Sequence, residues 1–472
     1  MDQEKISSFV KKIKTKTKLI LKDLKNANLI IDLLACAQEE NKLILCASCQ
    51  ALGTVFLHYV SAKPFLKGDK TAVSAEDANK EDQVSSWLKD QFTATCDVLC
   101  DFLSHESLEV KKISLKVISS LLQTNEVNSS QNVVGTLIEG IIGQLIKSDI
   151  DQTDIIGEVP VLWNAADKSS ALISLCLVHI RKQMKSVVQP ASDIFQRNCW
   201  KLIKQIASQD LDDKCRRQLT SVICDFLKQK MSANLYKDIL TGISVVMEKM
   251  SSPLRLTDFL SESFNIGGAI SLMSLHGLFI LMHKYNLDYP DFYAKLYSMF
   301  RPQIFSAKYR ARFFHLADTF LSSTHLPSYL VAAFAKRLSR LSLHAPASAV
   351  HIAIPFIFNL IARHPSLEVM IGRTDLPSEL TSDPYIPDEK EPASCKALDS
   401  CLWELQTLEH HYDPSISQKA QKRKVAEQDL SSILETTTSD IISSYAKKIK
   451  KDTIPLNFVK INGLTLAGNF VL

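Results

Sequence analysis

Glycine is scarce in this chain, which has only 13 glycines among its 472 residues. Their share is about 3%, whereas globular proteins average roughly 7%. Glycine supplies the positive-φ backbone conformations that tight turns and phosphate-binding loops require. The shortage therefore argues against large parallel-sheet nucleotide enzymes and against many-stranded barrels. Long helices joined by short connections need little glycine, so the composition favours a helical fold.

A large net charge and a targeting segment are also missing. Lys and Arg number 55 against 51 Asp and Glu, so the net charge is only +4 and any nucleic-acid binding must be local. The N-terminus, MDQEKISSFVKKIK, has no apolar core of the kind found in a signal peptide. The 11 cysteines are odd in number and lie mostly in apolar stretches, which indicates free thiols in a reducing compartment.

Signatures of catalysis are absent as well. The chain contains no Gly-x-x-x-x-Gly-Lys-Ser/Thr loop, no dinucleotide-binding Gly-x-Gly-x-x-Gly and no Gly-x-Ser-x-Gly elbow. His105 and Glu106 lack the second histidine that a zinc protease requires, and Cys46 and Cys49 lack two further zinc ligands. We therefore expect no enzyme, no cofactor, no metal and no small-molecule substrate, and we interpret Cys46 and Cys49 as structural thiols.

Apolar residues recur at every third or fourth position along most of the chain. Residues 107–122 place Val110, Ile113 and Val117 on one broad face, and residues 42–59 have the same pattern. Such successive amphipathic helices are typical of stacked repeats. The sequence therefore predicts an all-α protein, an elongated helical-repeat solenoid of the HEAT/armadillo-like kind with an extended C-terminal tail at 454–472.

Two apolar stretches approach the composition of a membrane span. Residues 264–283 contain two histidines and two adjacent glycines, and residues 350–362 are short and contain a proline. A bilayer span needs about 20 predominantly apolar residues. Buried helices are therefore favoured, and a nuclear-envelope membrane protein is kept as an alternative.

Residues 275–363 are rich in aromatic side chains, as expected of a core built from packed helices. Lys308, Arg310 and Arg312 lie among apolar residues there, and unpaired charge is costly to bury. These three side chains must reach solvent, a carboxylate or a partner. The next helix, 330–343, is expected to carry its basic residues on the polar face: Lys336, Arg337 and Arg340.

The passages YNLDYPDFYAKLY, KYRARFFHLADTFLSSTHLPSYLVAAFAKRLSRLSL and IPFIFNLIARHP resemble the CCAAT-binding-factor domain of the nucleolar complex proteins. Among these they are most similar to the nucleolar complex protein four group. The resemblance continues through 383–385 and 397–412 to 455–458, so it covers about 275–458, while the first 250 residues agree only in being helical. It implies a non-catalytic nucleolar scaffold of small-subunit ribosome assembly.

The resemblance also implies partners. These are nucleolar protein fourteen, other proteins of the small-subunit processome, and pre-ribosomal RNA through phosphate contacts, in support of RNA processing and of subunit maturation and export. No membrane is expected. We predict the following interface residues, for each of which internal capping or ion pairing is the alternative: Tyr289, Asp291, Tyr293, Lys308, Arg310, Arg312 and His325.

Two basic clusters are similar to nuclear-localisation signals, which acidic grooves recognise by charge. Their residues are Lys422, Arg423 and Lys424, followed by Lys447, Lys448, Lys450 and Lys451. A third basic run lies at the N-terminus, where a solvated helix face is the alternative to phosphate or acidic-partner binding: Lys11, Lys12, Lys14, Lys16 and Lys18. Together they indicate a nuclear protein, and the family resemblance implies the nucleolus.

The chain divides on these grounds into three parts. Residues 1–250 form N-terminal helical repeats with polar loops near 62–83 and 147–168, and residues 251–372 form the CCAAT-binding-factor-like helical domain. Residues 373–472 combine an acidic, proline-rich linker with C-terminal helices and the tail. From the repeat texture alone, a nuclear transport or adaptor protein is the main alternative to the scaffold.

Overall fold

The computed structural model describes residues 3–62, 75–124, 127, 130–164, 169–187, 191–372, 382–421 and 427–451. Within those ranges the regular structure is helical and contains no strand, which confirms the predicted all-α, helical-repeat class. The predicted tail at 454–472 lies outside them. The chain forms two compact units, Met1–Leu287 and Asp288–Leu472. The domain limits expected at 250 and 372 stay predictions.

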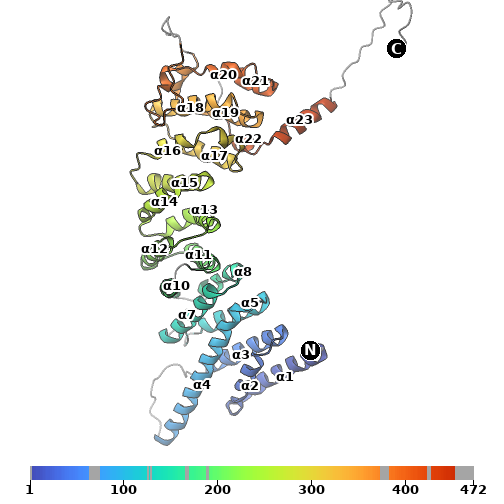
Figure 1. The fold of residues 1–472 in the computed structure, drawn as a ribbon. Helices are drawn as coiled ribbons and strands as arrows, with labels where there is room; N and C mark the ends of the chain where they lie inside the picture. The colour runs from blue at the N-terminus through green and yellow to red at the C-terminus, as the bar shows by residue number, and fades with distance from the viewer. Residues whose placement is uncertain are drawn as a thin grey trace, which may run out of the picture. The chain divides into compact units, whose positions relative to one another are not determined.

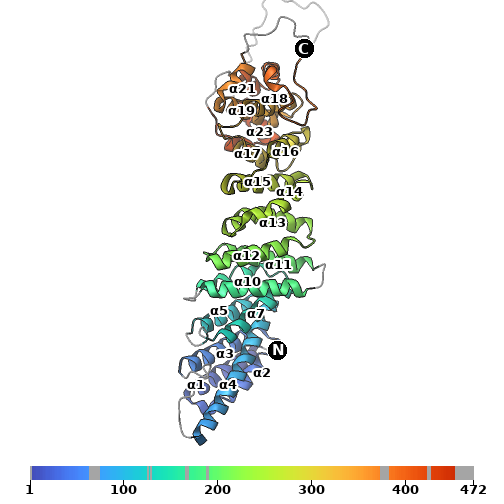
Figure 2. The same ribbon diagram turned by 90° about the vertical axis from the view of Figure 1, so that its left-hand side faces the viewer.

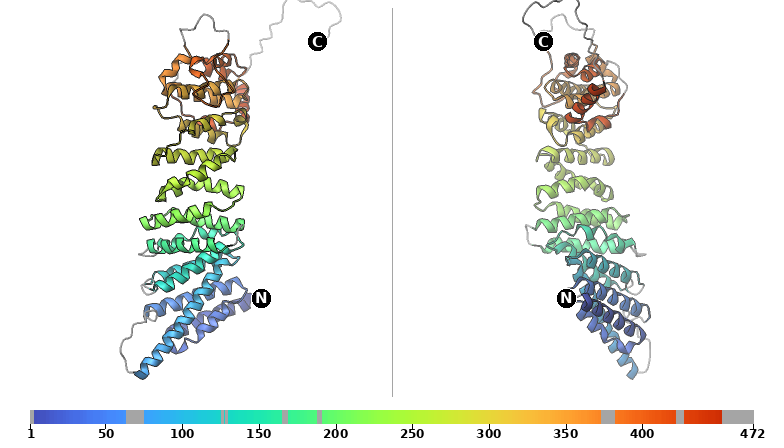
Figure 3. Two further views of the ribbon diagram at one scale, coloured as in Figure 1. Left: turned by 60° about the vertical axis from the view of Figure 1, so that its left-hand side comes forward. Right: turned by 90° about the vertical axis from the view of Figure 1, so that its right-hand side faces the viewer.

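The first unit is a stack of helices that follow one another in chain order (Figure 1). From α10 onward they lie nearly parallel to one another (Figure 3). The longer helices are α1 (Gln3–Lys22), α2 (Leu29–Cys36), α3 (Lys42–Ala62), α4 (Ala75–Asp101), α5 (Leu108–Leu122), α7 (Gln131–Lys147), α10 (Ser169–Ser186), α11 (Asp193–Ala207), α12 (Asp213–Leu227), α13 (Ala233–Lys249), α14 (Thr257–Phe264) and α15 (Gly268–Tyr285).

Alternate helices of this unit pack on one another and so make two layers. Helices α7, α10 and α12 pack in succession, and so do α11, α13 and α15. Large side chains fill the space between neighbours: the rings of Trp200 in α11 and Phe226 in α12 stack with their centroids 6.1 Å apart. Stacked helices of this kind bury a continuous core in which each repeat contacts mainly its neighbours.

Serine caps begin two of these helices. The backbone N–H of Phe195 donates to Ser192 Oγ at 3.2 Å at the start of α11, and that of Leu235 donates to Ser232 Oγ at 3.4 Å at the start of α13. An N-cap side chain satisfies one of the unpaired N–H groups of the first turn. Helix α10 ends at Ser186 and α11 begins directly after its cap, at Asp193.

Parts of both predicted polar loops are helical. Near 62–83, α4 already begins at Ala75, because AEDANKEDQ contains strong helix formers and neither glycine nor proline. Near 147–168, two short helices form, α8 (Thr153–Ile156) and α9 (Pro160–Asn164). Their apolar side chains, including Ile156 and Trp163, are buried. Short buried helices carry too few residues to show a helical period.

One helix of the described ranges is long and apolar enough to cross a membrane, the stretch Lys42–Ser61 of α3. It lies in the stack between α1 and α5, and 61% of it is buried there. Leu52, Val55 and Phe56 have no exposed surface, as in a core helix. The stretch 264–283 does not meet the same criterion, and 347–363 is a shorter apolar helix.

The second unit is built on α16 (Phe292–Met299), α17 (Arg310–Phe320), α18 (Ser328–Ser342) and α19 (Ala347–Arg363). Its core is a cluster of phenylalanines with no more than 1% exposure: Phe292, Phe300, Phe313, Phe314, Phe320 and Phe334. Neighbouring rings meet edge to face, for example Phe300 and Phe313 with centroids 5.0 Å apart. The aromatic enrichment of 275–363 therefore reflects core packing.

Later segments of the second unit pack back onto these helices (Figure 2). The short helix η6 (Ala397–Asp399) and α20 (Trp403–Leu408) pack on α18. Helices α21 (Pro414–Gln421), α22 (Ser431–Leu434) and α23 (Thr438–Lys451) pack on α19. The C-terminal helices thus share one core with α16–α19.

Candidate interaction surface

Four of the seven predicted interface residues are exposed. They are Asp291, which precedes α16, Lys308, which precedes α17, Arg312 in the first turn of α17, and His325 in the turn before α18. No ion pair joins any of them to another described residue, and the Asp291 side chain does not cap α16. These side chains are available to a partner, but no contact brings them together.

Both predicted tyrosines are half-buried and make internal contacts. The Tyr289 hydroxyl accepts a hydrogen bond from Lys295 Nζ, which also lies 4.8 Å from the Tyr289 ring centroid. The Tyr293 hydroxyl donates to the carbonyl of Phe320 at 3.4 Å. Burial raises the pKa of Tyr293. The Tyr289 contact joins the segment before α16 to α16, and the Tyr293 contact fastens α16 to the end of α17, so each tyrosine has an internal role.

Arg310 also has internal partners. Its guanidinium donates to the carbonyl of Thr436 at 2.9 Å, and to the carbonyl of Phe305 and to Ser348 Oγ at 3.3 Å each. Burial lowers the pKa of Arg310. The side chain thereby ties the turn before α23 to α17 and α19. The interface role of all seven residues stays a prediction.

The prediction for Lys336 is wrong: this side chain has no exposed surface. Its Nζ lies 2.7 Å from Glu404 Oε1 and 2.9 Å from Asp383 Oδ2, and it donates to the carbonyl of Cys401 at 2.7 Å. The periodicity places Lys336 on the polar face of α18, but residues 383–404 cover that face. No sequence signal pointed to this pairing, because Asp383 and Glu404 lie far from Lys336 along the chain.

The two carboxyls around Lys336 differ in their electrostatics. Burial raises the pKa of Glu404, and the attraction of Lys336 only partly offsets that effect. Burial also acts on Asp383, but hydrogen bonds from Ser400, Trp403 and Lys336 outweigh it and hold the pKa of Asp383 at about 2. An ionised Asp383 therefore neutralises Lys336, and the cluster fastens residues 383–404 to α18. We call Lys336, Asp383 and Glu404 the lysine clamp.

A second polar cluster fastens α21 and α23 to α19. His351 Nε2 lies 3.2 Å from Asp413 Oδ2, and the Tyr445 hydroxyl donates to Asp413 Oδ1 at 2.6 Å. Lys419 Nζ lies 3.3 Å from His351 Nδ1. Burial and the Lys419 charge lower the pKa of His351 despite Asp413, so the ring is neutral, with Nε2–H donating to Asp413 and Nδ1 accepting from Lys419.

The basic clusters are only partly described. Lys422, Arg423 and Lys424 lie outside the described residues. Lys447 is exposed on α23, and Lys448, Lys450 and Lys451 belong to the same helix. The N-terminal run lies on α1, where Lys16 pairs with Asp32 at 2.7 Å, while its other four lysines are exposed. A localisation role for these clusters stays a prediction.

The described residues offer little for catalysis. They contain no group of three or more His, Cys, Asp or Glu side chains that could hold a metal ion. All the cysteines are free thiols. Burial raises the pKa of Cys49 to about 12 and also raises that of Cys46, so both stay protonated at neutral pH. This is the behaviour of structural thiols.

Two family models match the sequence. Residues 271–420 match the CBF/Mak21 family, and this range overlaps most of the 275–458 region where the resemblance was expected. Residues 3–158 match the family described as nucleolar complex protein 4-like, TPR repeats. The N-terminal region, for which the sequence indicated helical character alone, is therefore also specific to the family.

Relatives align with nearly the whole chain. The nucleolar complex protein 4 homolog of Danio rerio is 35% identical over 98% of this chain and 96% of its own length. The homolog of Gallus gallus is 34% identical over 94% and 95%, and that of Homo sapiens 32% over 94% and 93%. The chain belongs to the nucleolar complex protein 4 family.

Proposed function

We propose that this protein is a non-catalytic scaffold of small-subunit ribosome assembly in the nucleolus. It acts in a complex with nucleolar protein fourteen and supports pre-ribosomal RNA processing and small-subunit maturation and export. The observation that carries the proposal is the near-full-length similarity to proteins named nucleolar complex protein 4 homologs. Their name assigns them to a nucleolar complex and indicates no activity.

The geometry of the chain suits a scaffold. Stacked helices present side chains from many repeats along one surface, and such surfaces bind extended partners. Polar side chains hold segments of the chain together in the lysine clamp and in the polar cluster around His351. Exposed Lys308, Arg312 and His325 remain available for contacts between proteins.

Helix α1 offers a surface suited to RNA phosphates. Lys11, Lys12, Lys14 and Lys18 are exposed along it, and no ion pair of the described residues involves them. Lysines contact phosphate oxygens without reading base sequence. Contacts of this kind would position pre-ribosomal RNA on the scaffold without giving sequence specificity.

Affinity purification of the tagged full chain from nuclear extract tests the proposal. We expect small-subunit processome proteins, including nucleolar protein fourteen, to co-purify after nuclease treatment. Recovery of a small GTPase and shuttling cargo instead would support the transport adaptor and contradict the scaffold.

A charge-reversed variant tests the predicted interface in the same assay. Lys308→Glu with Arg312→Glu should lower the recovery of partners severalfold while leaving the helical circular dichroism signal unchanged. Lys390→Glu with Lys396→Glu is the matched control, since both residues are exposed in the same unit. Equal recovery with the two double variants would exclude Lys308 and Arg312 from the interface.

A further inference from the structure

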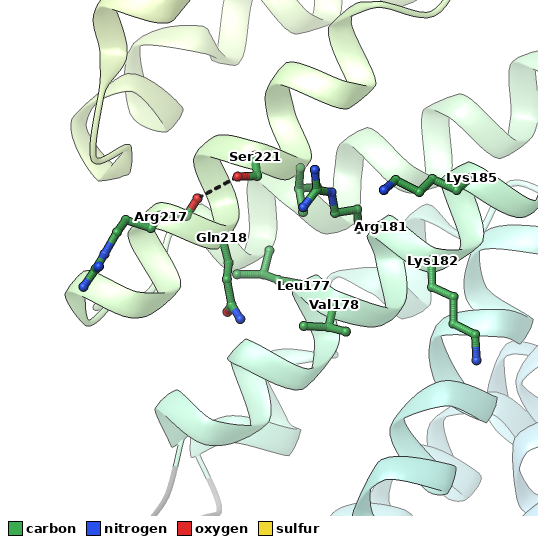
Figure 4. A pocket seen from close by; sticks show the side chains of 9 residues that line it. Leu177, Val178, Arg181, Lys182, Lys185, Arg217, Gln218 and Ser221 are labelled. Atoms are coloured by element: carbon green, nitrogen blue, oxygen red, sulfur yellow. Dashed lines mark hydrogen bonds between the residues drawn. The ribbon is translucent and has the colours of Figure 1, made fainter.

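A surface cleft with a volume of about 490 Å³ lies between α10 and α12 of the first unit. Its size is that of a site for a small ligand or for one or two side chains of a partner. Figure 4 shows the side chains that line it. The two helices are neighbours in one layer of the stack, so the cleft follows the packing of successive repeats.

The floor of the cleft is apolar. Leu177 and Val222 are buried beneath it, and Val178 lies beside them with 47% of its surface exposed. Helix α10 thus presents a branched apolar side chain to solvent next to the opening. An apolar side chain entering the cleft would cover Val178 and displace water from the floor.

The rim of the cleft is basic. Arg181, Lys182, Lys185 and Arg217 line it, and no acidic residue does. Arg181 pairs with Asp225 at 2.7 Å, and Lys182 pairs with Glu139 at 2.6 Å. Among the described residues, no carboxylate pairs with Lys185 or Arg217. Two cations at the rim therefore have no anionic partner within the described chain.

One polar group inside the cleft also lacks a partner. The side-chain carbonyl oxygen of Gln218 is buried and accepts no hydrogen bond from any described residue. In Figure 4 the Gln218 amide extends toward Leu177 and Val178. A buried acceptor without a donor costs about 1–3 kcal/mol. Rotation of the Gln218 side chain would let a backbone N–H of a bound peptide supply that donor.

We propose that this cleft binds an acidic polypeptide segment that carries a large apolar side chain. The apolar side chain packs on Leu177, Val178 and Val222, carboxylates pair with Lys185 and Arg217, and a backbone N–H donates to Gln218. The apolar floor favours a polypeptide over a nucleic acid, whose contacts with lysine and arginine go mainly to phosphates. The inference rests on the proposed scaffold role and specifies the chemistry of one partner segment.

Selection from a random peptide library tests the proposal. Phage-displayed peptides of roughly 12 residues are selected in parallel on the purified full chain and on its Lys185→Glu, Arg217→Glu variant. We expect peptides enriched only on the unaltered chain to combine aspartate or glutamate with leucine, isoleucine, valine or phenylalanine. Enrichment of identical peptides on both proteins, or of peptides without acidic residues, would overturn the proposal.

The affinities of the selected peptides complete the test, measured by fluorescence anisotropy. Lys185→Gln with Arg217→Gln, and separately Val178→Asp, should each weaken binding by at least about tenfold. Lys214→Glu with Lys228→Glu changes charge on or next to α12 outside the cleft and should change the affinity less than about twofold. Circular dichroism checks that each variant folds. An equal loss of peptide affinity in the control variant with Lys214→Glu and Lys228→Glu would contradict a binding site at the cleft.

An oligouridylate of about 20 nucleotides is the second probe. RNA binding that disappears with Lys185→Gln and Arg217→Gln, while no acidic peptide binds, would overturn the proposal in favour of a phosphate site. The outcome is separate from that of the scaffold proposal. Co-purification of processome proteins can succeed when the peptide experiment fails, and the cleft can bind peptides when co-purification fails.

Discussion

Lys336 in α18 shows how a charged side chain can be fully buried when protein groups replace its water contacts. Its ammonium group contacts both carboxyls of the lysine clamp and one backbone carbonyl, and it lies 5.3 Å from the Trp403 ring. A buried ion pair contributes little net stability, but removal of one partner leaves the other charge uncompensated. The clamp therefore fixes the position of residues 383–404 on α18, while the intact ion pairs add little to the net free energy of unfolding.

Lys336→Met should destabilise the second unit. The loss of the ammonium leaves Asp383 ionised without its cation and leaves Glu404 buried with only the more distant Arg340, at an expected cost of about 3–5 kcal/mol. Thermal denaturation followed by circular dichroism measures the effect. Arg340→Met is the control, because Arg340 is 38% exposed and lies 3.9 Å from Glu404. If Lys336→Met lost no more stability than Arg340→Met, the result would contradict the role of the lysine clamp.

His351 should make the second unit sensitive to acid. Burial lowers the pKa of His351, and Lys419 and His411 add to this effect against Asp413. The unfolded chain takes up a proton on this ring below about pH 6.5, whereas the folded chain resists it, so stability is present above that pH and is lost as the pH falls. His351→Gln should therefore show a smaller fall in melting temperature between about pH 7.5 and 5.5.

The measurement is the melting temperature of both proteins at the two pH values. Comparing the change in melting temperature between the two pH values removes any pH-independent loss of stability that the substitution itself causes. Asp413, whose pKa is lowered, loses its contribution only at a more acidic pH, so it does not act in this window. An equal pH dependence of the two proteins would show that the ring does not stay neutral in the folded state.

At the residue level, the sequence predicted exposure better than pairing. It required Lys308 and Arg312 to reach solvent, a carboxylate or a partner, and both are exposed. It gave no indication that Lys336 is enclosed, because Asp383 and Glu404 lie 47 and 68 positions along the chain. Helical periodicity describes one helix at a time, and it contains no information about a distant segment that covers the polar face.

At the scale of elements, close helix packing explains one of the few glycines. A Cβ atom on Gly53 in α3 would lie 2.5 Å from Val117 Cγ1 in α5. The valine side chain is branched and stiff, so it cannot easily move aside. Backbone conformation explains Gly267. Its φ is 97° at the turn into α15, and other residues rarely adopt this conformation.

Alanine at two helical glycines should therefore have opposite effects. Gly53→Ala should cost about 1–3 kcal/mol, because the added methyl group forces α3 and α5 apart. Gly135→Ala in α7 meets no atom within 4 Å and should stabilise the protein by about 0.5–1 kcal/mol. Urea denaturation measures both changes. Shifts in the same direction would contradict the packing described for α3 and α5.

The sequence predicted individual helices well where they are long. The helix expected at 107–122 is α5, and that expected at 42–59 is α3. Predictions failed for α8 and α9, which are too short to display a period, and at the start of α4, where the helix is polar. Before α17, which begins at Arg310, the chain makes a short helix at Pro302–Ser306.

At the scale of the whole chain, the described C-terminal segments pack on the core of the second unit. Arg310 holds Thr436, the lysine clamp holds residues 383–404, and Tyr445 holds α23 through Asp413. The sequence predicted a linker and C-terminal helices from composition. Their attachment depends on contacts between residues far apart in the chain, which composition does not reveal.

The family match extends the account from the second unit to the N-terminal repeats. Residues 3–158 and 271–420 both match family models, and relatives align over nearly all of the chain. The proposed scaffold therefore uses both units. A cleft in the first unit and exposed basic residues in the second offer separate places for partners to bind.

Rapid depletion of the protein, followed by pulse labelling of newly made ribosomal RNA, tests the central claim most directly. A scaffold of small-subunit assembly predicts a severalfold loss of newly made small-subunit RNA, with large-subunit RNA nearly unchanged, and recovery when the intact chain is restored. Unchanged labelling of both RNAs, or an equal loss of both, would contradict the account.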